Sequence, residues 1–269
     1  MVMPTHRRRV HRSKRSRKPL WIAIFLIAVV AIAVAVVYSM TPSEYTLTVY
    51  TFGQGSVIPT NNTYSSGTTV NLQAVSASNW TFYDWQGDAS GGDNTSITMD
   101  GNKVVNATFV ENKNRVLLTT NMGDITIQLR DDMPITTGNF KNLVQQGKYD
   151  GTAFHRIIAD FMIQGGQINS SWPSIQDEFS SDNHNDRGTI AMAKTSEPNS
   201  ATTQFFINVV NNGNVTSTFD STYSVFGDVV DGMDVVDAIS NVPVTTNPLT
   251  SEVSQPTQEV ILIKATFID

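Results

Sequence analysis

The sequence predicts a mainly β protein with two helices, a separate small all-β module and one N-terminal transmembrane helix. Three observations lead to this fold class. Residues 20–38 form an uncharged apolar run, residues 44–110 alternate apolar and polar side chains, and residues 115–269 combine strand-like runs with two short stretches of helical periodicity. Alternation with a period of two indicates strands, whereas apolar positions three and four apart indicate helices.

The first 19 residues carry a charge opposite to that of the rest of the chain. They hold eight of the 18 Lys and Arg residues and no acidic residue, although the whole chain has a net charge of −6. The other 10 basic residues stand against all 24 acidic ones. Because phosphate binding needs clustered cations, we expect no nucleic-acid partner for this acidic body. The chain contains no cysteine, which excludes disulfides, thiol catalysis and zinc sites built on cysteine.

The uncharged run of residues 20–38 directly follows the basic tail. At about 1.5 Å per residue, a helix of this length just spans a hydrocarbon core of roughly 30 Å. Trp21 and Tyr38 stand at its two ends, as in an interfacial aromatic belt. The positive-inside bias predicts residues 1–19 as a cytoplasmic tail, residues 20–40 as a single-pass transmembrane helix and the later residues as extracytoplasmic. The alternative is a cleaved signal peptide, for which the run is long and lacks a clear cleavage site.

Residues 44–111 are predicted to form a small β module of about five strands. Gly-, Asn- and Ser-rich turns separate its alternating runs. The strands are expected at Tyr45–Tyr50, Thr69–Val75, Thr81–Trp85, Ser96–Met99 and Lys103–Phe109. Three aromatic residues, Trp80, Phe82 and Trp85, are interpreted as core rather than as a ligand platform, since so small a domain needs them to form its interior.

The same segment is similar to the small repeat modules of bacterial and archaeal surface proteins that are related to the internalin B-repeat. The likeness rests on the Gly-x-Gly-Ser-Val run from Gly53, the Tyr-x-x-Gly-Thr-x-Val-x-Leu run from Tyr64, and the Trp-x-Gly-Asp run from Trp85. It implies an extracellular setting but no chemistry.

Within residues 115–269, helical spacing predicts one helix over residues 137–146, with Gly147 just after its end, and a second over residues 233–239. The predicted strands are a pair at the start, Arg115–Thr120 and Ile125–Leu129, and a closing strand, Glu259–Ile268.

Three stretches of this region, residues 154–166, 188–207 and 219–227, contain the functional signal. The first reads Phe-His-Arg-Ile-Ile-Ala-Asp-Phe-Met-Ile-Gln-Gly-Gly and places one cation, Arg156, among bulky apolar side chains, with Gln164 before a glycine pair. In this order and spacing the stretches resemble the signature of the cyclophilins, a family of peptidyl-prolyl cis/trans isomerases. The resemblance implies an eight-stranded antiparallel barrel with two helices over residues 115–269.

Isomerisation of an X-Pro bond has chemical requirements that these residue types meet. Rotation breaks amide resonance at a barrier of roughly 18–20 kcal/mol, and it needs neither a nucleophile nor a proton carrier. A catalyst needs an apolar pocket for the proline ring and a donor that favours the twisted bond. An arginine beside phenylalanine and methionine side chains supplies both.

The resemblance also implies a role for each matching position. The implied catalytic residues are Arg156, Gln164 and Phe206, and the implied substrate-binding residues are Phe161, Met162, Ala193, Lys194, Gln204, Phe219 and Tyr223. Phe219 and Tyr223 differ from the Trp or Leu-type residue and the His of many eukaryotic members. They point to the prokaryotic branch and to weak cyclosporin binding. Lys194 departs from the common Asn or Arg.

Other candidate sites are less consistent with the sequence. His155 is interpreted as structural, because the reaction needs no base. Ser200, Thr202 and Thr203 have no matching His/Asp arrangement, and the four histidines are too scattered for a zinc motif. The acidic loops at residues 88–100 and 182–186 do not have EF-hand spacing. We therefore predict no metal or organic cofactor.

These observations predict a prolyl isomerase that assists folding of exported proteins outside the cytoplasmic membrane. Its partners would be proline-containing segments of those proteins, and its N-terminal helix would hold it in the membrane. The alternative is a surface peptide-binding, adhesion or chaperone-like protein with little turnover. The repeat-like module and Lys194 favour that alternative, whereas the arginine and glutamine set argues against it.

Overall fold

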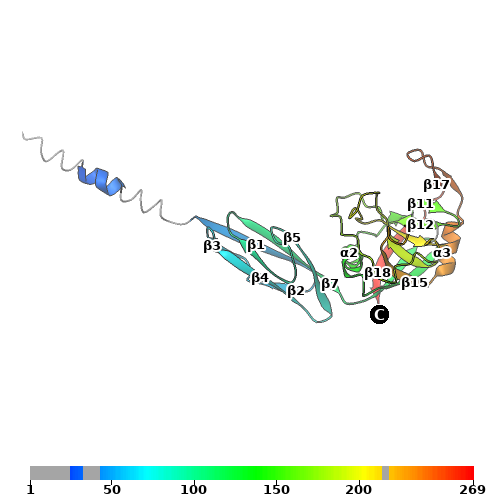
Figure 1. The fold of residues 1–269 in the computed structure, drawn as a ribbon, viewed down its shortest axis with the longest axis horizontal. Coiled ribbons are helices and arrows are strands. Elements are labelled where there is room, and N and C mark those ends of the chain that lie inside the picture. Colours follow the sequence, from blue (N-terminus) through cyan, green and yellow to red (C-terminus); the bar gives the residue numbers. More distant parts are fainter. Residues whose placement is uncertain (1–24, 33–42, 214–217) are drawn as a thin grey trace, which may run out of the picture.

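The protein is described by a computed structural model that covers residues 25–32, 43–213 and 218–269. Residues 25–32 are helical. The rest of the predicted transmembrane helix, like the basic tail, lies outside the described residues. Within the described ranges, no helix has the length and apolar character needed to cross a membrane. From residue 43 onward the chain forms two β-rich units that lie end to end (Figure 1).

The first unit is a β module with two sheets around one core. Its strands are β1 (Glu44–Phe52), β2 (Gly55–Ile58), β3 (Asn62–Ser65), β4 (Thr69–Ser76), β5 (Trp80–Gly87), β6 (Asn94–Thr98) and β7 (Lys103–Glu111). One sheet has the order β3-β1-β7-β5 and the other β2-β4-β6. Trp85 is buried in the shared core, and Trp80 and Phe82 pack against it. The two strands that the sequence did not predict, β2 and β3, have four residues each, too few for alternation to distinguish them from turns.

The second unit is built on one curled antiparallel sheet. Its elements are β8 (Arg115–Thr120), β9 (Gly123–Leu129), α2 (Pro134–Gln145), β10 (Thr152–Ala153), β11 (Arg156–Ile158), β12 (Met162–Gly165), β13 (Thr189–Met192), β14 (Phe205–Asn208), β15 (Val225–Asp231), α3 (Met233–Ser240), β16 (Val244–Thr246), β17 (Val253–Pro256) and β18 (Ile261–Ile268). In the described chain this sheet has the order β10-β18-β8-β9-β15-β13-β14-β12-β11. The two edge strands, β10 and β11, are separated in sequence only by Phe154 and His155, so the curled sheet brings its two edges close to each other at this corner. The sheet has nine strands in the described residues, one more than the eight expected from the resemblance.

Helix α2 begins at Pro134, three residues before the predicted start. The carboxylate of Glu178 accepts hydrogen bonds from the backbone N–H groups of Ile135 (3.2 Å) and Thr136 (2.9 Å). These N–H groups have no partner inside a helix, so a carboxylate there stabilises the first turn. Gly147 follows the helix with φ +61°, as expected for a residue just past a helix end. The start of the helix therefore depends on a residue more than 40 positions away.

The module packs directly on the second unit. Gln145 of α2 donates a 3.0 Å hydrogen bond to the carbonyl of Phe109 in β7. The ring of Tyr83 lies so close to Gly138 that a Cβ there would be 2.3 Å from it. Burial raises the pKa of Tyr83 well above its ordinary value, because the phenolate would lose its hydration. The two units are therefore joined by side-chain contacts as well as by the polar segment between β7 and β8.

Candidate active site

Nine of the ten residues that the sequence singles out line one cavity of about 150 Å³ in the second unit. They are Arg156, Phe161, Met162, Gln164, Ala193, Lys194, Phe206, Phe219 and Tyr223. The tenth, Gln204, is not one of the lining residues and accepts a 2.8 Å hydrogen bond from the side-chain amide of Gln164. A larger cavity of about 500 Å³ between the two units includes none of these residues. We take the smaller cavity as the site because its lining, rather than its size, matches the chemistry.

Strand register brings the polar and apolar halves of the site together. Arg156 of β11 pairs with Gln164 of β12, and Gln164 pairs with Phe206 of β14. Directly paired residues of adjacent strands present their side chains on the same face of a sheet. The alternate residues, such as Ile163 and Phe205, point to the other face and are fully buried in the main core. Period-two alternation therefore places the site on one face and the core on the other.

The apolar part of the cavity is formed by aromatic rings and one methionine. The rings of Phe206 and Tyr223 meet edge-on with their centroids 5.4 Å apart, and the ring centroids of Phe219 and Phe161 are 6.0 Å apart. Met162 is 1% exposed and Phe206 is 4% exposed. Such a pocket suits an apolar ring of the size of proline, because filling it removes apolar surface from water.

The guanidinium of Arg156 is bound on two sides. On the pocket side, Nη1 donates to Oε1 of Gln164 (3.2 Å). On the other side, Nε and Nη2 donate to the two carboxylate oxygens of Glu252 at 2.6 and 2.8 Å. Hydrogen bonds from Arg156 lower the pKa of Glu252, so the ion pair is complete above the ordinary glutamate range and is lost only as the pH falls through the lowered value. Glu252 lies 96 residues beyond Arg156, and no local motif marks it.

Lys194 lines the cavity, but its ammonium group is directed elsewhere. Its Nζ lies 2.5 Å from Oδ2 of Asp177, and the two side chains are only 8% and 14% exposed. The backbone N–H of Asn199 donates to the same carboxylate oxygen (3.0 Å). A charge so well buried is held by its partner, so Lys194 contributes mainly its aliphatic stem to the groove.

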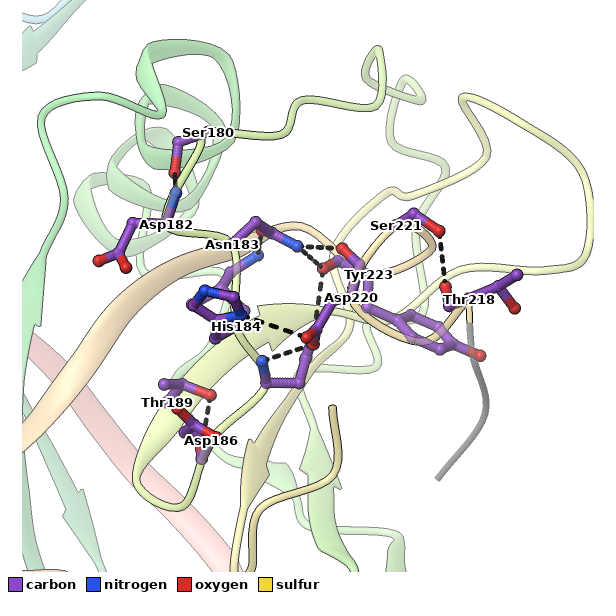
Figure 2. Close-up of polar contacts among 12 residues, drawn as sticks. Ser180, Asp182, Asn183, His184, Asp186, Thr189, Thr218, Asp220, Ser221 and Tyr223 are labelled. Carbon is purple, nitrogen blue, oxygen red and sulfur yellow. Dashed lines mark hydrogen bonds and ion pairs between the residues drawn. The ribbon is translucent and has the colours of Figure 1, made fainter. Parts of the chain in front are cut away.

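The segment that carries Phe219 and Tyr223 is held by a polar network (Figure 2). The side-chain amide of Asn183 donates to the backbone carbonyls of Asp220 and Tyr223, and its oxygen accepts from the N–H of Val225 (2.8 Å). Burial works against ionisation of Asp220, but hydrogen bonds from Asn185 and His184 outweigh it and lower the pKa of this carboxyl. Sequence reasoning assigned no role to Asn183 or Asp220, because their partners are brought close only by the fold.

We expect Asn183→Ala to loosen the aromatic wall of the cavity. The change leaves the carbonyl of Asp220 and the N–H of Val225 without the partner that Asn183 provides, and leaves the carbonyl of Tyr223 only a 3.4 Å hydrogen bond from Asn185. The expected cost is about 1–3 kcal/mol in the free energy of unfolding. The activity of the site should fall as well, because Phe219 and Tyr223 lose their fixed positions. Urea unfolding and the reaction rate of the variant measure the two effects.

His184→Ala is the matched control, since His184 belongs to the same network but is exposed and contributes only a surface pair to Asp220. Equal stability and equal activity of the two variants would contradict a special role for Asn183.

Neither His155 nor Ser200 lines the small cavity, although the side chain of His155 hydrogen-bonds that of Gln204. His155 lines a different cavity, and burial lowers its pKa, which favours the neutral ring at neutral pH. The hydroxyl of Ser200 is engaged in local turn contacts with Thr195 and Glu197. In the described ranges, no group of three or more His, Asp or Glu side chains is arranged to hold a metal ion.

In comparison with known proteins, two family models match separate parts of the chain. Residues 115–266 match the family model described as cyclophilin type peptidyl-prolyl cis-trans isomerase, and residues 45–113 match the divergent InlB B-repeat domain. The chain is 43% identical over 162 residues to a peptidyl-prolyl cis-trans isomerase of Acinetobacter baylyi, covering 57% of this chain and 86% of that protein. It is 42% identical over 158 residues to peptidyl-prolyl cis-trans isomerase B of Escherichia coli, covering 55% of this chain and 95% of that protein.

A solved structure shows the same fold for the second unit. It is a cyclophilin type isomerase of Cryptosporidium parvum crystallised in the presence of the dipeptide Ala-Pro, with a TM-score of 0.50 and 26% identity over 58% of this chain and 99% of that chain. The fold of the second unit, the family match and the sequence relatives therefore all indicate the same family. The chain belongs to the cyclophilin family: it is a cyclophilin-type peptidyl-prolyl cis-trans isomerase whose catalytic domain follows a divergent InlB B-repeat domain.

Proposed function

We propose that this isomerase is anchored in the cytoplasmic membrane and accelerates X-Pro isomerisation in exported proteins on the outer side. The observation that carries the site assignment is that Arg156 and Phe206 face one small cavity from neighbouring parts of the same sheet. A cation and an apolar ring pocket side by side meet the two requirements of X-Pro rotation.

In this mechanism the cavity holds the substrate at the proline ring. Phe161, Met162 and Phe206 surround the ring, while the polypeptide on either side stays in the open groove. Nη1 of Arg156 donates a hydrogen bond to the imide nitrogen, whose lone pair becomes available as the bond twists and resonance is lost. A donor that binds the twisted state better than either planar state lowers the barrier.

The amide residues support this arrangement. Gln164 accepts from Arg156 and donates to Gln204, so its orientation is fixed from both ends. We assign it to hydrogen bonding with the substrate backbone and to holding the arginine. Ala193, Gln204 and the stem of Lys194 would line the groove for residues that precede the proline.

The external location is supported by the N-terminal sequence and by the module. Residues 1–19 are strongly basic, and the uncharged run of residues 20–38 follows directly. This pattern favours a cytoplasmic N-terminus and a single membrane pass. A B-repeat domain between the membrane and the catalytic domain would act as a spacer or as a contact to the cell envelope.

Fractionation of cells that express the full chain tests the location. The protein should remain in salt-washed membranes, and added protease should digest its catalytic domain in intact spheroplasts. Mass spectrometry of the mature N-terminus separates the alternatives: an intact N-terminus supports the anchor, whereas a chain cut near residue 40 shows a removed signal. A catalytic domain protected from protease until lysis would contradict export.

The second candidate, a surface binder with little turnover, is favoured only by the B-repeat domain and by the paired Lys194. An isomerase assay on X-Pro peptides separates it from the enzyme. Turnover far above the uncatalysed exchange supports catalysis, whereas peptide binding at the uncatalysed rate would support the binder.

A further inference from the structure

Glu252 reaches the active site from a hairpin outside the nine-stranded sheet of the described chain. Strands β16 and β17 form this hairpin, in which Val244 pairs with Pro256. Its turn is fixed by hydrogen bonds from the N–H of Asn247 to the carbonyl of Glu252 (2.7 Å) and from the N–H of Ser251 to the carbonyl of Asn247 (2.9 Å). Strand β17 lies against β11, the strand that begins with Arg156. The hairpin therefore holds the carboxylate at the outer side of the guanidinium.

The contacts of Arg156 divide its donor groups into two sets. Nε and Nη2 are bound by the two oxygens of Glu252. Nη1 instead contacts the pocket residues, with Oε1 of Gln164 at 3.2 Å and Sδ of Met162 at 3.7 Å. Glu252 thus occupies the donors that face away from the proline pocket and leaves the pocket-facing nitrogen to the substrate.

A bidentate carboxylate fixes the plane of a guanidinium as well as its position. Arginine has a long side chain with many rotamers, and at 32% exposure the side chain of Arg156 is not confined by burial alone. A transition-state donor contributes most when it is already oriented before the reaction begins. Gln164 alone provides one contact to Arg156 and leaves rotation about that contact free.

We propose that Glu252 is a positioning residue for Arg156, which its hairpin holds with Nη1 directed at the proline pocket before a substrate binds. This inference rests on the proposed catalytic role of Arg156. It assigns a function in the isomerase reaction to the β16–β17 hairpin, which lies in sequence between the last helix and the last strand.

The test compares Glu252→Gln with the wild-type full-length protein in detergent, using an X-Pro peptide and NMR exchange measurements that separate kcat from KM. Glutamine keeps the size of the side chain but offers only one acceptor and no charge. We expect kcat to fall about tenfold, within the range for a slightly misplaced catalytic group, with KM little changed. Glu259→Gln is the matched control, because Glu259 is an exposed glutamate shortly after the same hairpin.

A double variant shows whether Glu252 acts through the arginine. In the Arg156→Ala background, Glu252→Gln should have no further effect, because there is no guanidinium left to orient. An equal loss in both backgrounds would place the role of Glu252 elsewhere and overturn the proposal. Unchanged kcat in Glu252→Gln would also overturn it, and raised kcat would identify the carboxylate as a competitor for the arginine. If Arg156→Ala itself kept full activity, the site assignment would fail before the role of Glu252 came into question.

Discussion

Arg156→Ala should lower kcat/KM for an X-Pro peptide by about 10²–10³, the scale of removing one preorganised transition-state donor. The cavity would keep its apolar lining, so the peptide should still bind. The loss is therefore expected in kcat more than in KM, since the arginine favours the twisted bond over the planar one. A protease-free NMR exchange assay measures both constants.

Two controls show whether the loss of activity comes from unfolding or from the loss of positive charge: the melting temperature of Arg156→Ala and the activity of Arg156→Lys. Both members of the Arg156–Glu252 pair are about one-third exposed, at 32% and 34%, so breaking the pair should have little effect on the melting temperature. Arg156→Lys keeps the positive charge but cannot reproduce the planar bidentate contact with Glu252. It should remain well below the wild type. Wild-type activity of Arg156→Ala would remove Arg156 from the mechanism, whereas wild-type activity of Arg156→Lys would show that a charged donor suffices without the planar guanidinium.

Phe205 and Phe206 are adjacent in sequence but should respond to truncation in opposite ways. Phe205 is fully buried, and its ring meets those of Phe140, Tyr149 and Phe154 edge-on. Phe205→Ala should lower the free energy of unfolding by about 3–5 kcal/mol, because it leaves a closed cavity among these rings. This is the largest stability loss that we expect from a single change near the site.

Phe206→Ala enlarges a cavity that is already present, so it should cost less stability and more activity. Its ring forms part of the pocket with Phe219 and Tyr223. Losing it should lower kcat/KM by at least about tenfold, because an apolar contact worth about 1.5–3 kcal/mol is removed from the bound proline. Urea unfolding and the isomerase assay are run on both variants. A stable Phe205→Ala, or a fully active Phe206→Ala, would contradict the placement of the two rings.

Some of the site could be read from the sequence because its residues lie on strands that are close together along the chain. The stretch from Phe154 to Gly166 contains β11, β12 and the turn between them, and its resemblance to the cyclophilin signature associated Gln164 with Arg156. Likewise, alternation along β14 assigns Phe205 and Phe206 to opposite faces. The roles of these residues stay predictions until the variants are measured.

Other features were missed because their partners come from distant parts of the chain. The carboxylate of Glu178 accepts hydrogen bonds from the first turn of α2, and the side-chain amide of Asn183 donates to the backbone carbonyl of Tyr223. Neither residue belongs to a local sequence motif. The hairpin β16–β17 was missed because its strands have three and four residues, too short for a periodic signal.

The sequence by itself determined the division into a B-repeat module and a β-rich catalytic region, the two helices and the cyclophilin signature. These depend on periodicity, turn residues and local motifs, which a linear chain displays directly. Only the tertiary structure decided that Lys194 is paired with Asp177 and that Glu252 binds Arg156. Such contacts join residues 17 and 96 positions apart. These contacts form because strand register and the path of the β16–β17 hairpin bring the polar groups close together. A linear sequence does not show which distant polar groups will meet.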